Sequence, residues 1–331
     1  MRELVMVITD CYLAGERAPA AARLPGLEHI ARFGERAVLA DGWRAYLARR
    51  VGCGALATAA PAAVAAAVLG REWGRRPGSW LASPVHLSAS HSRVHLDHRG
   101  LLRLGAAVQA RLCRGFAETF RGAGLALAAL PSGGFLLEAP QLPALASADP
   151  ERCAGGEIAA ALPQGQPAAG LRRLWAEIEM WLHAQPLAGE GAPNALWLWG
   201  AGAPLAPALS LAGGPWRAWG ADPYVDGLWR LRGEATQPQP AQLQDLLRSP
   251  GPAGAVLVLR VADELQQPPA RSFEAALASL DARYCVPAVA ALRAGSVDAV
   301  SLVANDAAFT VQRRSALKRW RRPRAGLGAL A

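Results

Sequence analysis

The segment Leu4–Ile8, with the sequence LVMVI, leads directly into Thr9 and Asp10 and sets the expected fold. All of its residues are apolar, so it shows no alternation between an exposed and a buried side. A continuous run of this kind, closed by a polar break, predicts a strand that is covered on both faces of a sheet. Three later runs have the same character: Leu196–Trp199, Ala255–Val261 and Val297–Val303.

Helical patterns separate these apolar runs. From Leu171 to Leu182, apolar residues recur at the i, i+3, i+4, i+7 spacing of one helix face, with charged residues on the other side. A second helical stretch covers 273–292, and we expect Pro287 to kink or break it. The alternation of strands and helices predicts an α/β protein with a doubly wound, mostly parallel sheet.

The middle of the chain has a different pattern. Short alternating strands are expected between Val85 and Leu104, a helix over 105–127 and another strand at 135–137. We therefore expect an inserted α+β cap subdomain. The chain then divides into a first core part at 1–82, the cap at 83–168, a second core part at 169–312 and a basic tail at 313–331.

Acidic residues follow three of the expected strands. Asp10, Asp263 and Asp306 each come within a few residues of a strand end. Ligands of open α/β sheets bind at the carboxyl ends of the strands. Converging carboxylates there predict a divalent-cation site for Mg²⁺, Mn²⁺ or Zn²⁺. The alternative is that these residues start turns and cap helices.

Two glycines, Gly200 and Gly202, follow the run that ends at Trp199. Their bare backbone amides could approach the phosphate of an anionic ligand. A third glycine and a Walker lysine are missing from this stretch, and a tight turn at the strand exit explains the glycines equally well.

A group of histidines surrounds Asp97 in the middle of the chain. On a strand, His95 and Asp97 would point to the same face, so a zinc site is conceivable. Their spacing does not match a closed metal motif, and solvated histidines on strands and turns are the other interpretation. The group consists of His86, His91, His95 and His98.

The net charge of +9 is concentrated near one end of the sequence. Seven basic residues lie within 313–324, and without them the net charge is 9 − 7 = +2. This tail could bind nucleic acid or anionic lipid, with Trp320 stacking on a base. Leu317 and Trp320 also suit a last helical turn, and a solvated basic tail is the alternative.

The remaining sequence features favour a cytoplasmic protein that is not embedded in a membrane. The five cysteines show no CxxC spacing and read as free, mostly buried thiols. The most apolar stretch, 56–69, is rich in alanine and too short to span a bilayer. The opening apolar block is shorter than the apolar region of a signal peptide.

Several blocks resemble the RpfE-type regulatory proteins of proteobacteria, which are described as phosphoglycerate-mutase-like. The most specific block is 194–200, Asn-Ala-Leu-Trp-Leu-Trp-Gly. The others are 84–87, 171–183, 273–281 and 320–323, so the resemblance spans most of the chain in scattered pieces. It implies a regulatory or ligand-binding role.

A fainter similarity connects the chain to the archaeal-type, cofactor-independent phosphoglycerate mutases of the alkaline phosphatase superfamily. The segment 25–31, Pro-Gly-Leu-Glu-His-Ile-Ala, looks like the start of a helix in those enzymes. Asp10 stands where their first metal ligand follows the first strand, and Asp263-Glu264 resembles their Asp-Glu pair. The similarity implies an alkaline phosphatase-like sheet with an inserted cap.

The chain departs from the mutase pattern at the residues that perform catalysis. Pro61-Ala62-Ala63 stands at the place of the nucleophilic serine, and the nearest hydroxyl is on Thr58. Gln267 replaces a metal-binding histidine, and Asn305-Asp306 replaces an Asp-His pair. Phosphoryl transfer of this type needs the nucleophile and its metals.

We therefore expect a non-catalytic protein that binds a small anionic ligand or a protein partner, with Asp10, Asp263 and Asp306 as remnants of a metal site. Two alternatives remain open. One is a metal-dependent phosphomutase or phosphatase with a rearranged site. The other is a nucleic-acid-binding module that acts through 313–324.

Overall fold

The computed structural model describes residues 1–12, 23–70, 73–75, 77–90, 93–145, 147–187, 189, 191–206, 211–248, 253–269 and 271–317. These residues form two compact units. Unit 1 comprises 1–57, 213–221 and 235–331, and unit 2 comprises 58–212 and 222–234. The chain passes between the units after residues 57, 212, 221 and 234. The sequence predicted boundaries between core, cap and tail after residues 82, 168 and 312.

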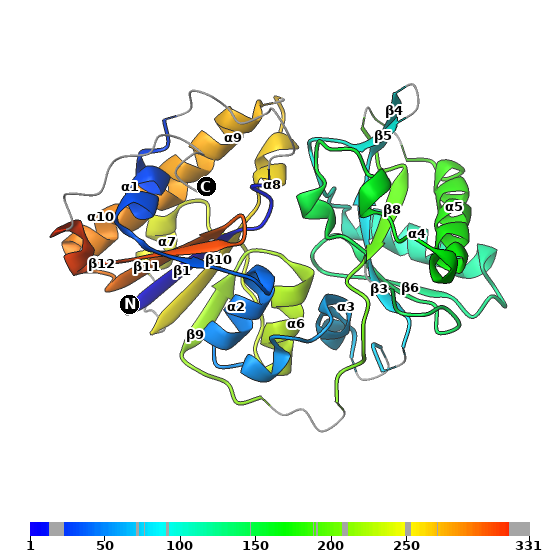
Figure 1. Ribbon diagram of the computed structural model, residues 1–331, viewed down its shortest axis with the longest axis horizontal. Helices are drawn as coiled ribbons and strands as arrows, with labels where there is room; N and C mark the ends of the chain where they lie inside the picture. Colours follow the sequence, from blue (N-terminus) through cyan, green and yellow to red (C-terminus); the bar gives the residue numbers. More distant parts are fainter. Residues whose placement is uncertain are drawn as a thin grey trace. The chain divides into compact units, whose positions relative to one another are not determined.

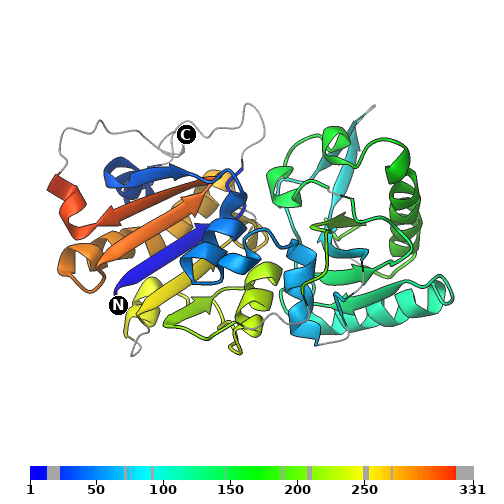
Figure 2. The same ribbon diagram turned by 60° about the horizontal axis from the view of Figure 1, so that its bottom comes forward.

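Unit 1 is built on a six-stranded sheet whose order is β2-β12-β11-β1-β10-β9. The four strands β9, β10, β1 and β11 are parallel, whereas β12 and β2 are antiparallel at one edge. Figure 2 shows β1, in dark blue, between β10 and β11. The strands are β1 Glu3–Ile8, β2 Glu35–Val38, β9 Trp216–Trp219, β10 Gly254–Leu259, β11 Ala299–Ala304 and β12 Ala307–Gln312.

Helices cover both faces of this sheet, which confirms the predicted α/β class and the mainly parallel central sheet (Figure 1). Leu4, Met6 and Ile8 of β1 point into a core shared with α1, α9 and α10. Glu3 lies on the other side of the pleat, where Arg50 of α2 binds its carboxylate. The helices are α1 Pro25–Phe33, α2 Gly42–Arg50, α7 Leu243–Arg248, α8 Val261–Leu265, α9 Phe273–Leu280 and α10 Val286–Ala294.

The predicted helix over 273–292 is continuous but changes its winding in the middle. A π-helical turn, Asp281–Cys285, joins α9 to α10 directly before Pro287. Proline has no N–H to give to an α-helical bond, and one wider turn accommodates this without a break. The stretch Phe273–Ala294 is apolar and long enough to cross a membrane, but 61% of its most apolar window is buried inside the fold, as in the core helix of an α/β protein.

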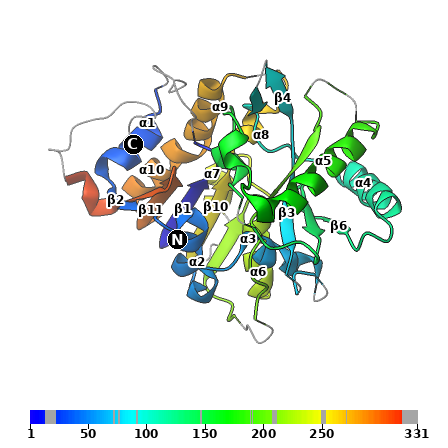
Figure 3. The ribbon, with the colours of Figure 1, turned by 45° about the vertical axis from the view of Figure 1, so that its right-hand side comes forward.

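Unit 2 contains a four-stranded antiparallel sheet, ordered β6-β7-β3-β8, and a separate hairpin of β4 and β5. Its helices α4 and α5 lie side by side, where Phe116 meets Trp181 edge to face at 5.3 Å (Figure 3). The elements are α3 Pro61–Ala65, β3 Ser79–Val85, β4 Leu87–Ser90, β5 Arg93–Leu96, α4 Ala106–Thr119, β6 Ala126–Ala129, β7 Phe135–Glu138, α5 Ala169–His183, β8 Ala195–Trp199 and α6 Pro223–Leu231.

Strand β8 differs from the prediction, because it was expected in the parallel sheet. It pairs antiparallel with β3 in unit 2. Leu196 and Leu198 face the core that contains α4 and α5, whereas Trp197 and Trp199 face the core that contains α3. The continuous apolar run therefore reports burial on both faces, as predicted, and carries no information on strand direction.

Candidate functional site

The three predicted carboxylates all lie in unit 1, close to the carboxyl ends of its parallel strands. Asp10 follows β1, Asp263 lies in the first turn of α8 after β10, and Asp306 lies in the turn after β11. Within the described residues, no group of three or more His, Cys, Asp and Glu side chains is arranged to hold a metal ion. Each of the three carboxylates has partners in the protein.

Asp10 binds the backbone at the start of α8. Its Oδ1 accepts a hydrogen bond from the Val261 amide at 2.7 Å, and its Oδ2 accepts one from the Ala262 amide at 2.8 Å. The residue is only 8% exposed. Burial raises the pKa of Asp10, although the Arg260 guanidinium and the two amides act in the opposite direction. Asp10 therefore caps a helix that belongs to the neighbouring strand, which is the alternative that the sequence left open.

Asp263 and Asp306 have separate partners. The Oδ1 of Asp263 lies 3.6 Å from a guanidinium nitrogen of Arg260, and the Oδ1 of Asp306 accepts a hydrogen bond from the Tyr12 hydroxyl at 2.8 Å. Asn305 and Asp306 both have positive φ angles, 49° and 59°. They form the two-residue turn between β11 and β12, for which Asn and Asp are favoured. Their presence after β11 is thus explained by the hairpin.

Three arginines near Asp263 and Glu264 were not predicted from the sequence. Arg260, 6% exposed, immediately follows β10, and Arg283 of the π-helical turn pairs with the buried Glu264. Arg271 binds the other oxygen of Glu264 at 2.9 Å. The position of Arg260 at a strand end could have been read from the sequence. The pairing of Glu264 with arginines seven and nineteen positions away depends on the tertiary fold.

Cys11, next to Asp10, is completely buried. Burial, assisted by the adjacent carboxylate, raises the pKa of its thiol far above the ordinary value, so it is no nucleophile at neutral pH. The prediction of free, mostly buried thiols is confirmed: all five cysteines are free, and Cys11, Cys53 and Cys285 are buried.

Gly200 and Gly202 lie in unit 2 against the start of α3. The Gly200 carbonyl accepts a hydrogen bond from the Ala62 amide at 3.0 Å, and Gly200 has a φ of 71°. A methyl group on Gly202 would lie 2.6 Å from the Cβ of Ala60. The backbone conformation and these close contacts explain why glycine stands at both positions, as the tight-turn interpretation expects. Their use for binding an anion stays a prediction.

The place of the missing serine is also described. Pro61 is the first residue of α3, and Ala62 and Ala63 are buried in its first turn. Thr58 precedes this helix by three residues.

The predicted histidine group and the basic tail are described only in part. His86 Nδ1 lies 2.8 Å from the Ala192 carbonyl oxygen, and His98 lies 3.4 Å from Asp97. Asp97 binds Arg99, which together with His98 lowers its pKa. His91 and residues 318–331 lie outside the described part of the chain, so binding of nucleic acid through 313–324 stays a prediction.

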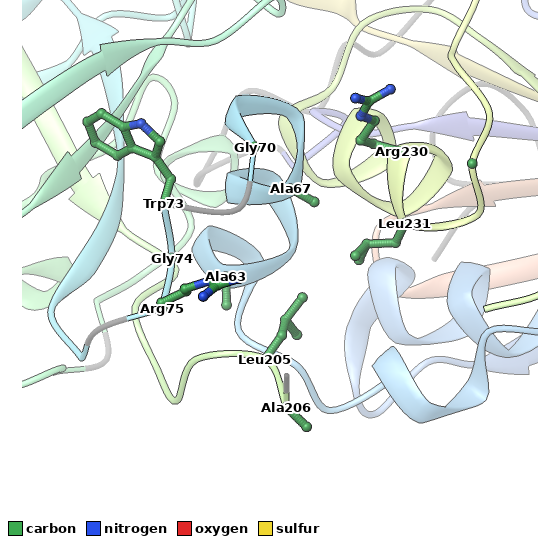
Figure 4. A pocket seen from close by; sticks show the side chains of 11 residues that line it. Ala63, Ala67, Gly70, Trp73, Gly74, Arg75, Leu205, Ala206, Arg230 and Leu231 are labelled. Atoms are coloured by element: carbon green, nitrogen blue, oxygen red, sulfur yellow. The ribbon is translucent and has the colours of Figure 1, made fainter. Parts of the chain in front are cut away.

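A pocket of about 790 Å³ in unit 2 was not predicted at all (Figure 4). It lies beside α3 and the following 3-10 helix η2, Ala66–Leu69. Arginine side chains stand on two of its walls: Arg75 before β3 and Arg230 at the end of α6. No sequence pattern connects these segments, because they are about 150 residues apart and only the fold of unit 2 brings them together.

The chain has only distant similarity to known proteins. No family model matches the sequence, and no curated protein matches it. Among solved structures, the cofactor-independent phosphoglycerate mutase from Thermoplasma acidophilum DSM 1728 is similar at 13% identity and a TM-score of 0.38, over 99% of this chain and 94% of the mutase. The PH0037 protein from Pyrococcus horikoshii is similar at 11% identity and a TM-score of 0.49, over 99% of this chain and 92% of that protein.

Proposed function

We propose that this protein is a non-catalytic member of the phosphoglycerate-mutase-like group that acts by binding a small anionic ligand in the cytoplasm. The observation that carries the proposal is the pairing of Asp10. Both of its carboxylate oxygens accept hydrogen bonds from the first amides of α8, and the side chain is buried. A carboxylate in this arrangement stabilises the fold, and a metal ion would have to compete with two charge-assisted hydrogen bonds for it.

The surroundings of Asp10 support the same conclusion. Asp263 is paired with Arg260 and Asp306 accepts a hydrogen bond from Tyr12, so both carboxylates have partners within the protein. Proline and alanine stand at the place of the nucleophilic serine in the resembling mutases. A regulatory role is favoured by the blocks that resemble RpfE-type proteins.

The test is turnover of 3-phosphoglycerate and a simple phosphate ester, together with thermal melting, in the presence of Mn²⁺, Mg²⁺ or Zn²⁺. We expect no turnover above that of the Asp10→Ala variant and no metal-dependent rise in melting temperature. Metal-dependent turnover in the natural protein that Asp10→Ala or Asp263→Ala abolishes, and that the exposed Asp298→Asn control retains, would show an active enzyme with a rearranged site.

A further inference from the structure

The pocket of unit 2 has the size and the construction of a small-molecule site. Its volume of about 790 Å³ lies within the ~300–1,000 Å³ that is usual for such sites. Its walls come from four segments of unit 2: the α3–η2 stretch, the segment 73–75, residues 205–206, and the end of α6. Figure 4 shows the α3–η2 stretch between Trp73 on one side and Leu231 on the other.

Small residues create this space. α6 crosses α3 so closely that a methyl group on Gly227 would lie 2.0 Å from the Val64 carbonyl oxygen. On the pocket side of the same helical stretch, only Ala63, Ala67 and Gly70 stand at successive turns. Their short side chains leave the volume open where larger residues would fill it.

The positive charge of the pocket favours an anionic ligand. Of the eleven residues that line it, Arg75 and Arg230 are the charged ones, and both are basic. No carboxylate within the described residues forms an ion pair with either guanidinium. Arg230 lies in the last turn of α6, where it also faces the negative end of the helix dipole. Arg75 precedes strand β3, so it does not lie in the last turn of a helix.

The remaining lining suits an organic group. Leu205 and Leu231 are partly buried and apolar, and Trp73 contributes to the lining as well. Guanidinium groups bind phosphate through paired N–H donors. We propose that this pocket binds a phosphorylated small molecule with an apolar body, whose phosphate is bound by Arg75, while Arg230 adds positive charge at another wall. The inference names the site and ligand class of the proposed binding function.

The experiment is calorimetric titration of the full chain with AMP and phenyl phosphate, and with adenosine and phenol as partners without phosphate. We expect the phosphorylated probes to bind and their counterparts to bind at least tenfold more weakly. The double variant Arg75→Gln/Arg230→Gln should lose tenfold or more in affinity, with Arg75→Gln contributing the larger share because Arg230 is partly engaged by its own helix.

Two further variants make the result specific. Arg114→Gln/Arg121→Gln removes the same charge from exposed positions of unit 2 outside the pocket and should retain the affinity. Ala67→Phe fills the pocket without changing the charge and should abolish binding while circular dichroism remains native. Absence of binding by both phosphorylated probes, or equal affinity in the pocket and control double variants, would overturn the inference.

The outcomes separate this inference from the proposed function. Metal-dependent turnover that requires Asp10 would contradict the proposed function, while binding that requires Arg75 would still support the pocket. Absence of both turnover and binding would leave the pairing of Asp10 intact and reject the pocket.

Discussion

Asp10 connects parts of the chain that are 251 positions apart. It lies at the end of β1, and the amides that it binds open α8 after β10, which is the neighbouring parallel strand. The side chain thus satisfies two amides that have no partner within their own helix. At the scale of single residues, a position that looks like a metal ligand in the sequence acts as a helix cap.

Replacing Asp10 by Asn should destabilise the protein. The amide side chain keeps one acceptor oxygen and loses the negative charge, so one of the two hydrogen bonds is lost and the other becomes neutral. We expect the free energy of unfolding to fall by about 1–3 kcal/mol in urea denaturation. Asp298→Asn, at an exposed position, should change it by less than ~0.5 kcal/mol. Equal effects of the two variants would contradict the capping role.

A second residue-scale prediction concerns pH. Burial, together with Arg293 and Arg32, lowers the pKa of His29 on α1. The unfolded chain therefore binds a proton at His29 at a higher pH than the folded chain does. As a result, the free energy of unfolding falls as the pH drops below about 6.5 and through the lowered pKa. Urea denaturation at pH 7, 6 and 5 should show a smaller decline in His29→Gln than in the natural protein, with His183→Gln as the exposed control.

At the scale of elements, α3 and α6 cross with their backbones in close approach at Gly227. Gly227→Ala places a methyl group against the Val64 carbonyl and should destabilise the protein by about 1–3 kcal/mol or more, because backbone must move. Gly115→Ala is the matched control in α4, where the nearest atoms are side-chain atoms at 3.6 and 3.8 Å. Alanine there should be neutral or stabilising by up to about 1 kcal/mol.

The elements also show what the sequence could establish. The helix over 171–182 is present as α5, and the apolar residues at the predicted spacing are buried: Leu171, Leu174, Trp175, Ile178, Trp181 and Leu182. The strands that were predicted to begin at Leu4, Ala255 and Val297 are present, and their ends differ from the prediction by at most two residues. Strand direction and the partners of Asp10, Asp263 and Asp306 were not predictable, because they depend on contacts between segments far apart in the chain. The pocket was missed for the same reason.

At the scale of the whole molecule, each unit has its own apolar core. Leu257→Ala in β10 should therefore weaken unit 1, and Leu136→Ala in β7 should weaken unit 2, each by about 2–5 kcal/mol. Hydrogen exchange read by mass spectrometry should show faster exchange in β1, β10 and β11 for the first variant, and in β3, β7 and β8 for the second. Loss of protection across both sheets in both variants would contradict separate cores.

The register of β1 has a consequence for biosynthesis. Leu4 pairs with Ala255 on one side and with Val300 on the other. At about 5–20 residues per second, the ribosome needs roughly 15 to 60 seconds to deliver both neighbours after β1 has been made. During that interval the nascent chain carries LVMVI as an unpaired apolar strand, and the strands of unit 2 are made before its two neighbours. Chaperone capture of the first segment is therefore expected to matter more for the yield of this protein than for one whose central strand is made last.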